Sequence, residues 1–120
     1  MFYWVQDFED RLNKLSRDLA EDVVGLLEGL LRDPELIYAQ DAFVWTRRDD
    51  VGPRAIQIVI KDAAADNVTI VVRFENGAMA GLFVKEGTHL TPDDVAIARA
   101  NYIETQEAID ARPSTWKRGS

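Results

Sequence analysis

The sequence contains no cysteine and only one histidine among its 120 residues. Without cysteine there is no disulfide, no thiolate nucleophile and no thiolate metal ligand. The histidine, His89, falls in a loop before the last predicted helix. A Ser–His–acid set around it would have to recruit Ser16, in the polar part of a helix, or Ser114, in a tail. The sequence therefore offers almost no residues suited to nucleophilic catalysis. We also expect no cofactor and no bound metal.

Long apolar runs, glycine-rich loops and a surplus of basic residues are also missing. No stretch of about 18 apolar residues occurs, so no membrane span is expected. The first residues have neither the basic region nor the apolar core of a signal peptide. No glycine-rich loop joins a strand to a helix, as a phosphate cradle requires. A net charge of −7 and a pI near 4.6 argue against direct nucleic acid binding, which depends on Lys and Arg. We expect a cytoplasmic protein without membrane association.

The charge that is present is unevenly distributed. Residues 1–41 carry ten acids and four bases, a balance of −6, whereas residues 42–90 carry six of each. Residues 91–120 carry five acids and four bases. The acidic surplus therefore lies almost entirely in the first third of the chain. Such a surface favours basic partners, and it also keeps a protein soluble.

The first third also has the apolar period of an amphipathic helix, from about Asp7 to Arg32. A straight helix of that length measures about 39 Å, against a diameter of roughly 35 Å for a compact domain of this size. We therefore predict that the helix breaks near Gly25 and Gly29 or that its end packs on another copy. The apolar stripe consists of Phe8, Leu12, Leu15, Leu19, Val23, Leu26 and Leu30.

The middle of the chain predicts strands. After a short helix over Pro34–Ala39, four segments are rich in β-branched and aromatic residues and are separated by turn residues. The fold class is α+β: an N-terminal long helix, a four-stranded antiparallel meander sheet and a C-terminal helix opened by Thr91-Pro92. We expect a single domain over residues 1–113 and a mobile tail over residues 114–120. The predicted strands are Phe43–Arg47, Ala55–Lys61, Val68–Phe74 and Met79–Lys85.

Asn76-Gly77 predicts a two-residue hairpin turn between the last two strands. This turn places Val71, Leu82 and Val84 together on the face opposite the predicted core face. That second face is too apolar to remain fully exposed to solvent, so either another helix or a second subunit covers it. We predict a homodimer that uses this face or the apolar end of the first helix. The core face is Ile70, Val72, Phe74, Met79 and Phe83, and the helix end is Leu26, Leu27, Leu30 and Leu31.

Four acids of the first helix are the predicted contact residues for a basic protein partner: Asp18, Glu21, Asp22 and Glu28. The first three also have a spacing that could hold a magnesium ion through oxygens. A solvated acidic face is the favoured interpretation, because basic residues are adjacent and no histidine is spaced to join a metal site.

Tryptophans near the two ends are the second candidate contact set. Trp4 and Trp116 are included because tryptophan is enriched at the energetic centres of interfaces. The competing interpretation for Phe2–Trp4 is a hydrophobic staple or an extra edge strand folded onto the core. For Trp116 it is a tail residue packed against its own domain.

The favoured function is a non-enzymatic, small acidic protein-binding module: an inhibitor, an immunity-type protein, an adaptor or a chaperone-like protein. The order of elements is broadly similar to that of small acidic immunity proteins and of type III secretion chaperones, although those chaperones insert a helix among their strands and this sequence shows none. One alternative is a small enzyme or ligand-binding domain, with a carboxylate-lined pocket that includes His89 or Tyr102. Another is a purely structural assembly subunit.

Overall fold

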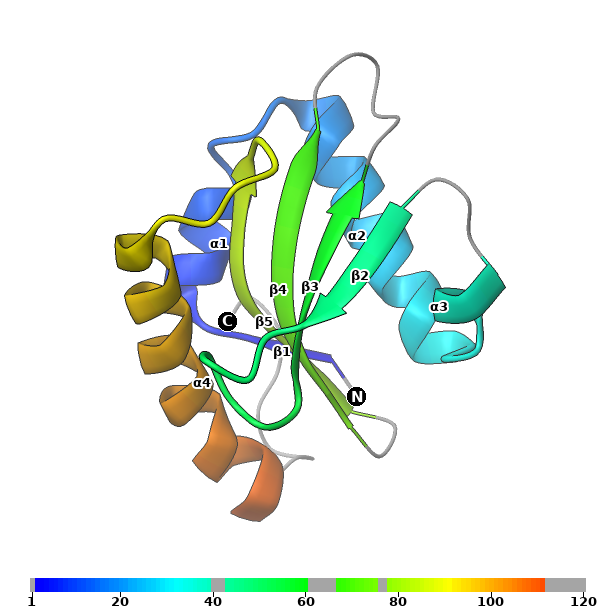
Figure 1. The fold of residues 1–120 in the computed structure, drawn as a ribbon. Coiled ribbons are helices and arrows are strands. Elements are labelled where there is room, and N and C mark those ends of the chain that lie inside the picture. Colours follow the sequence, from blue (N-terminus) through cyan, green and yellow to red (C-terminus); the bar gives the residue numbers. More distant parts are fainter. Residues whose placement is uncertain (1, 40–42, 61–66, 76–77, 112–120) are drawn as a thin grey trace.

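A computed structural model describes residues 2–39, 43–60, 67–75 and 78–111 of the chain (Figure 1). It has mixed α and β structure, with one five-stranded sheet flanked by helices. In chain order the elements are β1 (Phe2–Trp4), α1 (Gln6–Leu12), α2 (Arg17–Arg32), α3 (Leu36–Ala39), β2 (Phe43–Arg47), β3 (Ala55–Ile60), β4 (Val68–Glu75), β5 (Ala78–Glu86) and α4 (Pro92–Ala111).

The prediction of a four-stranded antiparallel meander matches in part: β2, β3, β4 and β5 pair in that antiparallel order, but the sheet has a fifth strand. Its order is β1-β5-β4-β3-β2, and β1 pairs in parallel with the start of β5. Tyr3 lies opposite Ala80 and Trp4 opposite Gly81. Both aromatic side chains are buried, so the N-terminal aromatic cluster forms the extra edge strand that was one of its two interpretations. Burial of large aromatic surface favours this position over an exposed one.

The predicted long helix is broken, but not at the glycines. α1 ends at Leu12 and α2 begins at Arg17, while Gly25 and Gly29 both lie within the continuous α2. The break coincides with Ser16, whose hydroxyl oxygen accepts a hydrogen bond from the backbone N–H of Leu19 at 3.3 Å. A serine cap of this kind satisfies one of the free N–H groups of a new helix. The break lets the two helices take different directions (Figure 1).

The hairpin of β4 and β5 follows the predicted register only near its turn. Val72 lies opposite Gly81 as predicted, but a bulge then shifts the pairing, so that Val71 lies opposite Phe83. An extra residue in one strand turns the following side chains to the other face. Phe83 is therefore on the face predicted for Val84, and Val84 takes the place of Phe83 in the other core.

Helices of the same chain pack on both faces of the sheet. The face that carries Ile58, Ile70 and Val72 is buried under α1 and α2. The opposite face of β4 and β5, including Val71 and Leu82, is buried with residues of α4. Figure 1 shows α2 and α4 on opposite sides of the sheet. A helix, rather than a second subunit, therefore covers the second apolar face.

Gly52 and Gly25 should respond in opposite ways to alanine. A Cβ at Gly52 would lie 2.5 Å from ring atoms of Tyr102, so α4 would have to shift. A Cβ at Gly25 meets nothing within 4 Å. We predict that Gly52→Ala lowers the free energy of unfolding by about 1–3 kcal/mol and that Gly25→Ala raises it by about 1 kcal/mol. Urea denaturation followed by circular dichroism measures both, and equal effects would contradict this packing of α4.

Candidate functional site

The outer face of α2 is the surface on which the predicted contact acids gather. Leu19, Val23, Leu27 and Leu30 are buried against the sheet, so the opposite side of the helix faces outward. Asp18, Glu21, Asp22 and Glu28 are all exposed. The structure thus brings the four acids to one helix and to the outside of the molecule.

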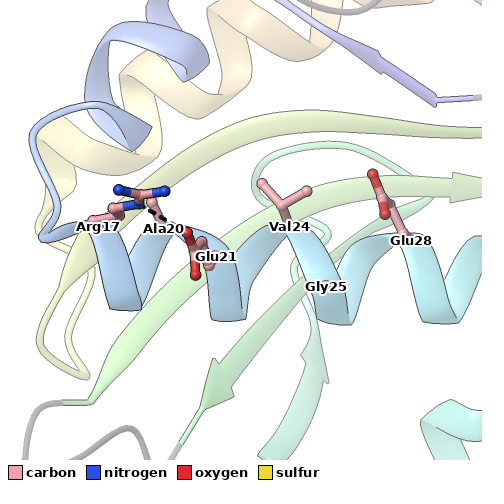
Figure 2. Close-up of a pocket in the computed structure, with 6 residues that line it drawn as sticks. All are labelled: Arg17, Ala20, Glu21, Val24, Gly25 and Glu28. Atoms are coloured by element: carbon pink, nitrogen blue, oxygen red, sulfur yellow. Dashed lines mark hydrogen bonds and ion pairs between the residues drawn. The ribbon is translucent and has the colours of Figure 1, made fainter.

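A shallow groove of about 370 Å³, widely open to solvent and lined by α2 alone, runs along this side of the helix. Ala20, Val24 and Gly25 line its apolar part, and Figure 2 shows the side chains of Val24 and Glu28 projecting from the same side of the helix. The charged rim consists of Arg17, Glu21 and Glu28. This side of α2 can therefore accept an apolar group while offering charges on either side of it.

One ion pair orders part of the rim. The Nε of Arg17 donates to Oε1 of Glu21 at 3.0 Å, one helical turn away. The two side chains are 90% and 65% exposed, so solvent screens the pair and it contributes little to folding. Both groups stay accessible to a partner.

Sequence reasoning found the acids of this surface but missed the floor of the groove. The signal that could have found it is the helical spacing of Ala20 and Val24, which lie one turn apart and share one side of α2 with Arg17 and Glu28. The sequence predicts a helix break near Gly25. In the structure it is an exposed helical residue with open space beside its Cα.

Trp4, one of the two tryptophans predicted as contact residues, does not contribute to this surface. Trp4 is 7% exposed and stacks on Phe8, with ring centroids 5.5 Å apart. It belongs to the core, because its ring fills the space between β1 and α1. Trp116 lies outside the described residues, so its role as a contact residue stays a prediction.

Most of the residues predicted for self-association are also inside the molecule. The exposed fraction is 0% for Leu27, Leu30, Val71 and Leu82 and 1% for Val84, and only Leu26 and Leu31 are partly exposed. These five buried side chains serve the two cores of a single chain. They offer no surface to a second copy in this fold, so a homodimer must use other residues.

A second hollow, of about 190 Å³, lies between the end of α1 and the end of β5. Three of its lining residues are cations: Arg11, Lys14 and Lys85. Arg11 pairs with Asp7 at 3.0 Å, and Lys85 is hydrogen-bonded to Asp94. Because these internal carboxylates compensate two of the three cations, the hollow is mainly a junction between α1, β5 and α4.

The side chains named for the enzyme alternative do not line either hollow. His89 is exposed in the segment before α4, whereas Tyr102 is buried with its ring 4.9 Å from the guanidinium carbon of Arg73. Burial raises the pKa of another tyrosine, Tyr3. Among the described residues, no group of three or more His, Asp or Glu side chains is arranged to hold a metal ion.

Searches against protein families, curated proteins and solved structures yield no significant match to this chain. Within the described residues, no helix has the length and apolar character needed to cross a membrane. The functional argument therefore depends on the surface chemistry of the chain itself.

Asp94 joins β5 to α4 and supports a pH-dependent prediction. Its carboxylate accepts from the backbone N–H of Thr91 at 3.0 Å, and the hydroxyl of Thr91 accepts from the backbone N–H of Asp94 at 3.1 Å. Burial acts to raise the pKa of Asp94, but hydrogen bonds from Lys85 and Thr91 and the charge of Lys85 outweigh it, so the pKa is lowered. The folded state thus holds this proton more weakly than the unfolded chain does.

Above the ordinary pKa range of aspartate, the ionised carboxylate of Asp94 contributes its whole stabilising effect to the folded state. This contribution is lost as the pH falls through the lowered pKa. We predict that Asp94→Asn lowers the free energy of unfolding at neutral pH by about 1–2 kcal/mol, mainly because the uncharged amide loses the charge-assisted hydrogen bonds that the carboxylate makes with Lys85 and with the backbone N–H of Thr91. Denaturant titrations from neutral to acidic pH should show the difference from wild type shrinking in acid. Asp93→Asn, at the exposed neighbouring acid, is the control and should change little. A difference that is constant with pH would contradict the role of the carboxylate.

Proposed function

We propose that the chain is a non-enzymatic protein-binding module whose contact surface is the exposed side of α2. The observation that carries the proposal is the groove on α2, with an apolar floor of Ala20, Val24 and Gly25 between charged side chains. Apolar contact with a charged rim is the arrangement found at protein–protein interfaces, where the centre provides affinity and the rim provides specificity. An inhibitor, an immunity-type protein, an adaptor and a chaperone-like protein all need such a surface.

Charge indicates the chemistry of the partner. Asp18, Glu21, Asp22 and Glu28 are exposed along one helix, in a chain with a net charge of −7. An acidic surface accelerates the approach of a basic partner through long-range attraction, and salt weakens that attraction. The proposal therefore includes a basic protein partner in the cytoplasm.

Charge reversal on α2 tests the proposal without altering the core. In Asp18→Lys/Asp22→Lys, two exposed acids on the side of α2 next to the groove become basic. We predict that proteins captured by the immobilised wild-type chain from its native cells are lost with this variant. The association rate of a captured partner, measured by surface plasmon resonance, should fall at least about tenfold on going from low to high salt.

Asp93→Lys/Glu104→Lys is the matched control. It makes the same change in net charge at exposed positions of α4, and it too reverses one acid in a first helical turn. This variant should retain the partners. If both variants lost the partners equally, only the net charge of the chain would matter. An association rate that does not change with ionic strength would contradict the electrostatic part of the proposal.

A further inference from the structure

The outer side of β2 is an open edge of the sheet. β2 is the last strand in the order β1-β5-β4-β3-β2, so within the described part of the chain no strand pairs with it on that side (Figure 1). A strand in this position presents backbone N–H and C=O groups that can pair with a further strand. β2 can therefore offer main-chain hydrogen bonds, as well as side chains, to a partner.

The ladder between β2 and β3 identifies which groups point outward. The N–H of Arg48 donates to the carbonyl of Ala55 at 2.9 Å, which continues the β2–β3 register by one pair. Along a strand, residues that bond to the neighbouring strand alternate with residues that point away from it. The N–H and C=O groups of Phe43, Trp45 and Arg47 therefore point away from β3, and they have no backbone partner among the described residues.

β2 lacks the features that usually keep an edge strand from pairing. Such strands carry lysine, proline, a bulge or an inward-pointing charge, whereas the sequence of β2 is Phe-Val-Trp-Thr-Arg and its register with β3 is unbroken. Its one charged residue, Arg47, forms an exposed ion pair with Asp49 at 3.5 Å. The edge is therefore regular, mostly apolar and able to accept another strand.

Apolar side chains gather at the same edge. Three large hydrophobic residues are exposed in the described part of the chain, and two of them, Tyr38 (77%) and Val44 (44%), lie here. The ring of Tyr38 is edge-on to the ring of Trp45, with centroids 6.0 Å apart. A strand added to β2 would cover part of these side chains and so remove apolar surface from water.

A second copy of β2 fits this edge in one register. If two β2 strands pair antiparallel about a two-fold axis at Trp45, Trp45 faces its own copy and Phe43 faces Arg47 of the other copy. Each outward N–H and C=O of one strand then meets its complement on the other. A register centred on Val44 or Thr46 would instead leave Arg47 or Phe43 without a partner in the second β2.

The side chains suit the same register. Residues of one face meet residues of the same face, because the two-fold axis is perpendicular to the sheet. Val44 therefore lies opposite Thr46 of the second copy, and two β-branched side chains form a favourable cross-strand pair. Arg47 faces Phe43 rather than a second arginine, so no like charges are directly opposite within the paired strands.

The charge distribution favours a second copy over a basic partner at this edge. The acidic surplus lies in residues 1–41, whereas residues 42–90 carry six acids and six bases. Two copies can therefore approach through β2 without bringing their acidic surplus together, and a basic partner gains no long-range attraction from this segment.

We propose that two copies of this chain associate by antiparallel pairing of their β2 strands about Trp45, so that one sheet continues through the dimer. The occupant of the open edge is a second copy of the chain. This surface is separate from the groove on α2, because no residue of β2 lines that groove. The dimer therefore leaves the exposed acids of α2 available to another protein.

Proline at position 47 tests the backbone pairing in the purified full chain. Arg47→Pro removes an outward N–H that the ladder with β3 does not use, and its ring obstructs a second strand. Arg47→Thr removes the same charge but keeps the N–H. Sedimentation equilibrium from micromolar to millimolar concentration should show wild type moving from 13.6 kDa toward twice that mass, and Arg47→Thr should do the same. Arg47→Pro should keep the circular dichroism of the wild type and raise the dissociation constant at least about tenfold.

Charge on the exposed face of β2 provides a second test that needs no proline. Position 44 of one copy faces position 46 of the other, and both residues are exposed. Val44→Lys/Thr46→Lys and Val44→Glu/Thr46→Glu each place like charges opposite one another, so each alone should stay monomeric. An equimolar mixture places lysine opposite glutamate and should dimerise. Ala96→Lys/Ile103→Lys makes the same change in charge as the lysine variant at exposed positions of α4, and it should dimerise like wild type.

Hydrogen exchange followed by NMR identifies the strand that pairs. In the monomer the N–H groups of Trp45 and Arg47 face solvent, whereas the N–H of Thr46 is bonded within the ladder. Dimerisation at high concentration should slow exchange at Trp45 and Arg47 at least about tenfold. Thr46 should be protected at low concentration already.

A wild-type chain that stays at 13.6 kDa at every concentration would overturn the proposal. So would Arg47→Pro that dimerises as well as Arg47→Thr, a mixture of the charged variants that stays monomeric, or a dimer whose Trp45 and Arg47 amides exchange as fast as in the monomer. Protection of these amides only after another protein binds would assign the edge to a strand of that protein instead of a second copy. Self-association and the proposed function fail separately, because Arg47→Pro should retain the basic partner and Asp18→Lys/Asp22→Lys should retain the dimer.

Discussion

A sheet with two apolar faces is the constraint on which the rest of this structure depends. Along β4, Ile70 and Val72 point to one face while Val71 points to the other, and all three side chains are fully buried. Alternation of this kind leaves neither face suited to water. The chain must therefore supply helices to both sides. α1 and α2 cover one face, and α4 covers the part of the other face formed by β4 and β5.

The two helical layers meet around β5. The side-chain amide of Asn101, on α4, donates to the backbone carbonyl of Leu82 at 2.8 Å and to the carboxylate of Asp7, on α1, at 2.9 Å. Arg11 also lies over the ring of Phe83, 4.7 Å from its centroid. These contacts join α1, β5 and α4, so the position of each helix is fixed with respect to the sheet. Polar groups buried in this way stabilise when each has its partner.

The orientation of α2 follows from the same constraint. Because its leucine and valine stripe is needed to cover the sheet, its acids and Gly25 face outward, while Ala20 and Val24 are partly buried at the margin of the stripe. Covering the core thus produces the surface to which we assign binding. The groove combines charge that can attract a basic partner with an apolar floor, so the proposed contact surface derives from the way one helix is packed. The margin of the sheet at β2 is covered less completely, and Val44 there is 44% exposed.

The sequence determined the element types, because periodicity and turn chemistry are local. The alternation within the strands, the Thr91-Pro92 start of α4 and the pairing of Val72 with Gly81 were all predictable from the residues. The acidic outer face of α2 was predictable for the same reason, since a helical stripe fixes which residues lie opposite it.

Only the tertiary structure decided how the helices and strands pack on one another. The continuous apolar stripe favours one long helix, whereas Ser16 favours a break. The packing of α1 beside β5 favours the break. The bulge that exchanges the faces of Phe83 and Val84 depends on packing along β5, where Phe8 lies against Gly81. Which chain covers the second apolar face also depends on contacts between residues far apart in sequence, and no local pattern encodes them. The sequence thus specified apolar surfaces and charges, whereas long-range packing decided which of them remained outside.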